Sequence, residues 1–189
     1  MHGVTKEAGG RYPAGTPYDA RDPELLMWVH ATLVHTAMDV YARYVGSLSD
    51  SERNAYYEEQ KLLGEKFGVP RERQPDTLAD FEAYWDDMLR SDRLAVTGAL
   101  RDVVDATLRP DLPFFMRPVV EGLNLATVGL LPERMRAELG VPWGRNRQRL
   151  FGAGRAVLSA ALPVLPRVMR EFPPARSADK RVRRLAAAA

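Results

Sequence analysis

The 189-residue sequence contains no cysteine, which excludes disulfide bonds and thiolate metal sites. No apolar run approaches the roughly 20 residues that a membrane-spanning helix needs. The first residues lack the apolar core of a signal peptide. A reducing compartment is therefore permitted, and we expect a cytoplasmic protein without a transmembrane segment.

The common catalytic motifs are also missing. The sequence has no His-Glu-x-x-His motif, no Gly-x-Ser-x-Gly motif, and no strand pattern before Gly152-Ala-Gly154. His30 and His35 are five residues apart and diverge by roughly 140° around a helix, so they cannot hold one metal from the same face. We therefore expect no zinc hydrolase, nucleophilic triad or dinucleotide fold, and we assign no catalytic residue.

Lysine is scarce, and most of the 27 basic residues are arginine. The net charge is only +2, so the basic residues are weak evidence for a nucleic-acid partner. Two arginine-rich stretches, residues 145–149 and 180–184, read more simply as solvated faces than as binding surfaces. We expect no nucleic-acid partner, while peripheral contact with a membrane surface stays open.

What the sequence does contain is helical periodicity. Asp22 and Pro23 are typical of a helix start, and apolar residues then recur every three or four positions up to about Gly46. Ser49 with Glu52 and Thr77 with Asp80 have capping-box spacing. Further helices are expected after a cap at Asp92, at residues 119–131 and at 132–140, and as two kinked or separate pieces at 143–172.

These patterns predict one all-α domain of six to eight helices. We expect it to span residues 1–172, followed by an arginine- and alanine-rich flexible tail at residues 173–189. Glycine and proline are dense in residues 1–21, so we expect a loop there and no hairpin. The helix at 119–131 is apolar nearly all round and should be central.

One segment resembles a known family. The segment begins with His2-Gly3 and a glycine-rich loop, and continues with Tyr18-x-Ala-x-Asp-Pro-Glu-Leu-Leu-x-Trp28-Val-His30-Ala-Thr-Leu. This pattern resembles the MpaB-like and rubber-oxygenase catalytic domain family, whose relatives include latex-clearing proteins. Weaker matches follow in the right order over nearly the whole chain, among them Tyr56-Tyr57-x-Glu59, Gly68-Val69-Pro70 and Gly140-Val-Pro-Trp143.

The resemblance implies an all-α fold that holds haem b and uses O₂ to oxygenate or cleave a hydrophobic, often isoprenoid, substrate. It implies that His2 is the axial iron ligand. His30, Trp28 and Tyr18 are the implied cofactor-binding residues, with a structural role for His30 left open. In the family about a hundred residues precede this segment, so we expect the chain to be the C-terminal part of such a domain.

Haem needs an axial imidazole and an otherwise apolar pocket, and isolated histidines in an all-α domain are compatible with that. The alternative function is a non-catalytic helical module that binds an apolar ligand or lipid. The sequence alone assigns neither the substrate nor the oligomeric state.

Overall fold

A computed structural model describes residues 2–166 and 173–187 of the chain. The described residues contain eight α-helices, three short 3₁₀ helices and one two-stranded ribbon, which confirms the predicted all-α class. The elements are β1 (His2–Val4), β2 (Pro17–Asp19), α1 (Pro23–Tyr44), α2 (Asp50–Phe67), η1 (Arg71–Arg73), α3 (Leu78–Arg90), α4 (Gly98–Leu108), η2 (Phe114–Met116), α5 (Arg117–Leu130), α6 (Glu133–Glu138), α7 (Arg145–Ala161), η3 (Leu162–Val164) and α9 (Pro173–Ala187).

The N-terminal segment differs from the expected loop, because its two ends pair as an antiparallel ribbon. The glycines and prolines lie between the strands and form the turns that bring them together. The Thr5 hydroxyl donates to the Pro13 carbonyl, and Gly15 takes a left-handed φ of 85°. The expectation that there would be no hairpin was wrong, because the strands are too short to show an alternating pattern.

Helix α1 begins as predicted. The Asp22 carboxylate accepts the Glu24 N–H, and Pro23 occupies the first turn, where a missing N–H costs nothing. The side of α1 that carries Met27, Ala31 and Val34 is buried. These residues form the main core with residues of α2, α3 and the loop after α2, namely Tyr57, Val69, Leu78 and Phe81.

Helices α2 and α3 also start where the capping boxes predict. Gly68 ends α2 with a φ of 95°, which glycine adopts without strain. Helix α4 differs from the prediction, since Thr97 rather than Asp92 caps it. Both residue types are good caps, and the chain runs as turn and loop from Ser91 to Thr97.

Helix α5 is not the central helix that its composition suggested. Val128 is its only fully buried residue, whereas Val119 and Leu123 are 55% and 62% exposed. Helix α7 is continuous through both glycines that were expected to interrupt it, and Pro163 lies in η3 just beyond its end. Part of the second piece expected here, residues 167–172, lies outside the described residues.

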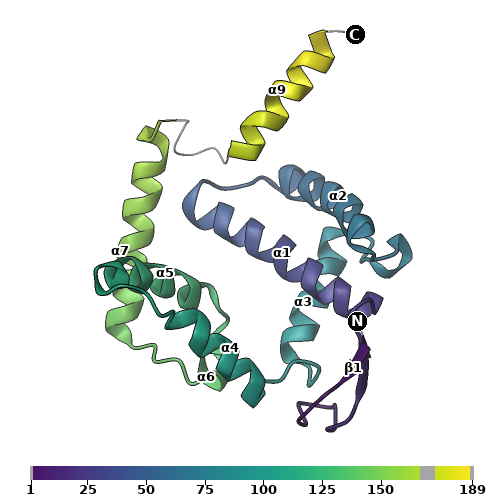
Figure 1. Cartoon of the computed structure of the whole chain (residues 1–189). Helices are drawn as coiled ribbons and strands as arrows, with labels where there is room; N and C mark the ends of the chain where they lie inside the picture. The colour runs from purple at the N-terminus through teal and green to yellow at the C-terminus, as the bar shows by residue number, and fades with distance from the viewer. Residues whose placement is uncertain (1, 167–172, 188–189) are drawn as a thin grey trace.

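Figure 1 shows α1 crossing the middle of the molecule, with α2 and α3 on one side and α5 and α7 on the other. Helix α9 extends away from the other helices, and its Val182 and Leu185 are largely exposed. The description of residues 173–189 as a flexible tail stays a prediction. None of the helices in the described residues is both long and apolar enough to cross a bilayer.

Candidate functional site

His2 lies in β1 directly opposite Asp19 of β2, so the two side chains share one face of the ribbon. Its Nδ1 is 3.3 Å from an Asp19 carboxylate oxygen, and its Nε2 is 3.3 Å from the guanidinium of Arg21. The backbone N–H of Arg21 lowers the pKa of Asp19, and the charges on His2 and Arg21 lower it further. Asp19 is therefore a stable carboxylate partner for the Nδ1 proton of His2.

Tyr18 lies next to this pair but on the opposite face of the ribbon, because neighbouring strand residues alternate. Its ring covers Gly3, where an added Cβ would lie only 2.8 Å from the ring carbons. The close contact explains why glycine is needed after His2. It also means that Tyr18 and His2 do not line a common surface of the ribbon.

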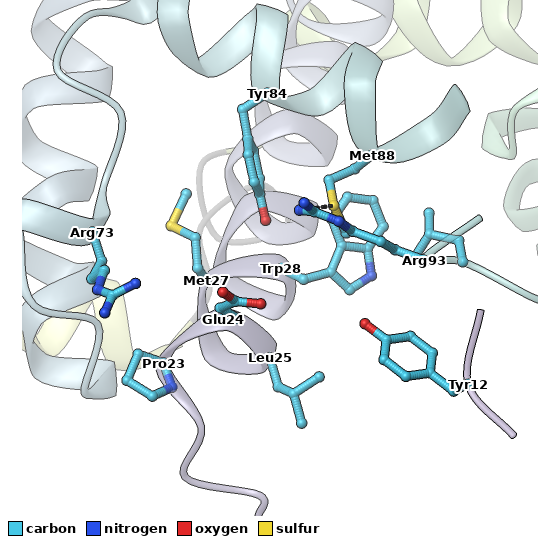
Figure 2. A pocket seen from close by; sticks show the side chains of 11 residues that line it. Tyr12, Pro23, Glu24, Leu25, Met27, Trp28, Arg73, Tyr84, Met88 and Arg93 are labelled. Atoms are coloured by element: carbon cyan, nitrogen blue, oxygen red, sulfur yellow. Dashed lines mark hydrogen bonds between the residues drawn. The ribbon is translucent and has the colours of Figure 1, made fainter. Parts of the chain in front are cut away.

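Trp28 lies in the second turn of α1 and lines a cavity of about 270 Å³. Figure 2 shows that side chains from α1, α3 and the loop after α3 surround this cavity. Behind Trp28 the rings form a stack, with Trp28 and Trp85 centred 5.2 Å apart and Trp85 and His35 centred 3.9 Å apart. Trp28 is thus both a cavity wall and part of the packing between α1 and α3.

His30 is only 2% exposed, and neither of its ring nitrogens completes a hydrogen bond. Its ring tilts against Phe67 at the end of α2. Burial lowers the pKa of His30, and the nearby Gln60 carbonyl opposes this only in part. His30 is therefore a neutral imidazole inside the core.

The four residues that the sequence singled out do not converge on one point. His2 and Tyr18 lie on opposite faces of the ribbon, Trp28 lines a cavity, and His30 is buried between α1 and α2. Within residues 2–166 and 173–187, no three histidine, aspartate or glutamate side chains gather as a metal site. His2 can therefore supply a metal with one imidazole ligand only.

A second cavity, which the sequence did not indicate, lies between α1, α5 and α7. Its volume is about 620 Å³, in the range of small-molecule pockets. The lining is almost wholly apolar, with Arg155 as its one charged side chain. It includes Val40, Tyr44, Leu125, Leu130, Phe151 and Leu158. Its residues come from three separate helices, so no local motif marks it in the sequence.

Comparison with known proteins decides the family. Residues 1–161 match the family described as ER-bound oxygenase mpaB/B′/Rubber oxygenase, catalytic domain. The chain belongs to this family. It is 32% identical over 160 residues to two proteins, Mb2261 of Mycobacterium bovis and Rv2237 of Mycobacterium tuberculosis, both described as uncharacterized.

The aligned region covers 82% of this chain and 62% of each mycobacterial protein, so the chain spans under two thirds of the length of these relatives. No solved structure matches the chain. The family match confirms the resemblance found in the sequence. The predictions that the chain is the C-terminal part of the domain and is cytoplasmic stay predictions.

The cofactor expected from the resemblance is haem b. The geometry at His2 meets one requirement of haem binding, which is an imidazole nitrogen that can hold the iron. Histidines that bind metals usually donate their second ring N–H to a carboxylate, as the position of Asp19 beside Nδ1 allows. Nε2 would then be the ring nitrogen left to hold a metal, if the Arg21 guanidinium moved aside. The two cavities described above are lined by neither His2 nor His30, so the fit rests on the donor atoms and not on a formed pocket.

Proposed function

We propose that this chain contributes to a haem b-dependent oxygenase in which His2 would hold the haem iron. The observation that carries this proposal is the His2–Asp19 pair, in which the proton lies on Nδ1 and Nε2 is the unprotonated ring nitrogen, contacted by the exposed Arg21 side chain. Membership of an oxygenase catalytic-domain family supports it. When bound, the haem would supply the activation of O₂.

The residues around His2 have separate roles in this proposal. Asp19 holds the Nδ1 proton and makes Nε2 more basic. Arg21 competes for Nε2, and its side chain is exposed enough to swing away. Tyr18 and Trp28 are proposed contacts of the cofactor at this end of the molecule. His30, which is buried against α2, is proposed to support the site as a neutral side chain.

The proposed substrate is a hydrophobic molecule, of which isoprenoids are one class. The chain can accommodate such a molecule in the groove between α1, α5 and α7, which is nearly free of polar groups and large enough for it. This groove lies at the C-terminal end of α1, at the opposite end of the helix from His2, so it is a binding site for an apolar ligand and not the place where the haem would act. Arg155 is the one charged residue that lines the groove.

The test of the cofactor is a hemin titration of the purified full chain, followed by the Soret band. We expect a band that is lost in His2→Ala and retained in His35→Ala, because His35 stacks on Trp85 away from the ribbon. Asp19→Asn should weaken hemin binding by about 10- to 100-fold. Arg21→Ala should strengthen it, since the competing donor on Nε2 is removed.

An unchanged Soret band in His2→Ala would reject His2 as the ligand. Absence of any band in the wild-type chain would reject haem binding by this chain. The sharper result is that Asp19→Asn weakens hemin binding while Arg21→Ala strengthens it. General unfolding would weaken hemin binding in both variants.

The second candidate function is a non-catalytic module that binds an apolar ligand, and the same groove favours it. An apolar fluorescent dye should bind the chain, and Leu125→Glu should abolish binding because Leu125 lines the groove. Leu123→Glu is the matched control on the same helix, since Leu123 is 62% exposed and outside the lining. Dye binding without hemin uptake would favour this function over the oxygenase.

A further inference from the structure

The cavity beside Trp28 carries polar groups that the proposed haem site does not use. Figure 2 shows the Tyr84 hydroxyl, the Glu24 carboxylate and the Arg93 guanidinium pointing into the same space. Arg73 borders the cavity from the other side. These four side chains come from α1, η1, α3 and the loop after α3, so the fold brings them together.

In residues 2–166 and 173–187, these polar groups form no ion pair and no hydrogen bond to an oxygen or nitrogen of the protein through their side chains. Within the described part of the chain, neither Arg73 nor Arg93 forms an ion pair, and no hydrogen bond satisfies the Tyr84 hydroxyl. The one side-chain contact of Arg93 is 3.7 Å from its Nη1 to the Met88 sulfur, a weak acceptor. Burial raises the pKa of Tyr84, so its phenol stays protonated and remains a donor at neutral pH.

The floor of the cavity is apolar. Met27 and Met88 are 4% and 6% exposed, and the Trp28 ring lies beside them. Methionine and tryptophan form an adaptable apolar surface for a small ligand. The cavity therefore pairs an apolar base with convergent donors, which is the usual composition of a small-molecule site.

We propose that this cavity binds a small apolar molecule through a single carboxylate, held by Arg93 and Tyr84, with the Arg73 guanidinium across the cavity from them. The charges select the head group. Two guanidinium groups and one carboxylate leave a net charge of +1, which matches a monoanion. Glu24 would repel the second charge of a phosphate, whereas a carboxylate can take both Arg93 donors in a bidentate pair.

This site shares the Trp28 ring with the haem proposal, but its polar groups have no role in that proposal and its test needs no hemin. The test uses the full chain without hemin and follows tryptophan fluorescence, because Trp28 lies in the cavity wall. We expect saturable quenching by phenylacetate at neutral pH. Phenylacetamide, which has the same shape without the charge, should bind at least about tenfold more weakly.

The variants assign the binding to these side chains. Arg93→Gln should weaken phenylacetate binding by about tenfold or more, and Tyr84→Phe should weaken it less. Arg90→Gln is the matched control, because Arg90 is exposed, pairs with Asp86 and lies outside the cavity. Glu24→Gln should strengthen the binding of phenyl phosphate relative to phenylacetate, since the repelling carboxylate is gone.

Equal binding of phenylacetate and phenylacetamide would overturn the proposal, and so would equal affinities of Arg93→Gln and the wild type. Absence of phenylacetate binding to the wild-type chain would also overturn it. Far-ultraviolet circular dichroism of each variant separates loss of binding from loss of the fold.

Discussion

At the residue scale, His30 is the most unusual side chain of the described structure. A buried imidazole normally has at least one hydrogen-bond partner, because an unpaired polar group in the core costs about 1–3 kcal/mol. Both ring nitrogens of His30 lack one. Its burial keeps it neutral and makes the stability of the fold depend on pH.

The sign of that dependence follows from the lowered pKa. The unfolded chain protonates His30 near the ordinary pKa of 6.5, whereas the folded chain resists protonation. The free energy of unfolding should therefore fall as the pH drops below about 6.5, until the folded pKa is passed. His30→Leu should flatten this fall in urea melts, and at pH 8 it should change stability by no more than about 1 kcal/mol.

The His35→Gln variant is the control for the urea melts of His30→Leu and the wild type. Burial lowers the pKa of His35 as well, so His35→Gln should remove only its own share of the pH dependence. A loss of more than about 2 kcal/mol in His30→Leu at pH 8 would mean that the ring nitrogens are bonded in the fold.

The residues that could be predicted from the sequence are those whose roles are local. Asp22, Ser49 and Thr77 each bond a backbone N–H two or three residues away, so short motifs reveal them. The His2–Asp19 pair depends on the strand register across a hairpin, in which the two residues lie 17 positions apart, and the sequence does not display this register. His2 was singled out from the family resemblance, and its partner was missed.

At the scale of elements, the helix starts are well defined. The Thr77 hydroxyl accepts the Asp80 N–H, and the Asp80 carboxylate accepts the Thr77 N–H. Thr77→Ala should cost about 1 kcal/mol of stability in a denaturant melt. Thr36→Ala is the matched control, because Thr36 is exposed within α1 and alanine is the better helix former there. Equal effects of the two changes would contradict the capping role.

The α5–α7 contact is a second feature at this scale. A Cβ on Gly129 would lie 2.4 Å from the Phe151 ring, whereas a Cβ on Gly122 of the same helix would meet nothing within 4 Å. Gly129→Ala should therefore lose about 1–3 kcal/mol through overpacking, and Gly122→Ala should gain up to about 1 kcal/mol from helix propensity. The measurement is a thermal or urea melt of each variant. A change of stability in the same direction for both variants would contradict this packing.

The same contact explains why α5 was misplaced in the sequence-based prediction. Its apolar residues suggested a helix surrounded by core, but only the turn that carries Gly129 packs closely on α7. Other apolar residues of α5 line the groove or are exposed. Composition reports how apolar a helix is, while the position of its neighbours depends on contacts between distant segments.

At the scale of the whole molecule, the buried side chains are concentrated on one side. Most of the core belongs to α1, α2, α3 and the loop after α2, whereas α4 and α6 contain no buried residue. The N-terminal segment connects the two regions, because the Glu7 carboxylate accepts the N–H groups of Gly98 and Ala99 at the start of α4. These bonds lower the pKa of Glu7, so the connection is fully present above the ordinary carboxyl pKa and is lost only as the pH falls through the lowered pKa of the folded chain.

Amide hydrogen exchange at neutral pH should report this uneven distribution. We expect the slowest exchange in the buried turns of α1, α2 and α3, and faster exchange throughout α4 and α6, because local opening costs least where few apolar contacts are broken. Glu7→Ala should speed exchange at Gly98 and Ala99 while leaving the core of α1 unchanged, since it removes the acceptor of those two amides. Glu59→Ala, an exposed change in α2, should leave the start of α4 unchanged. Uniform protection across α1 to α6, or an unaltered α4 in Glu7→Ala, would show that the N-terminal segment does not hold the two regions together.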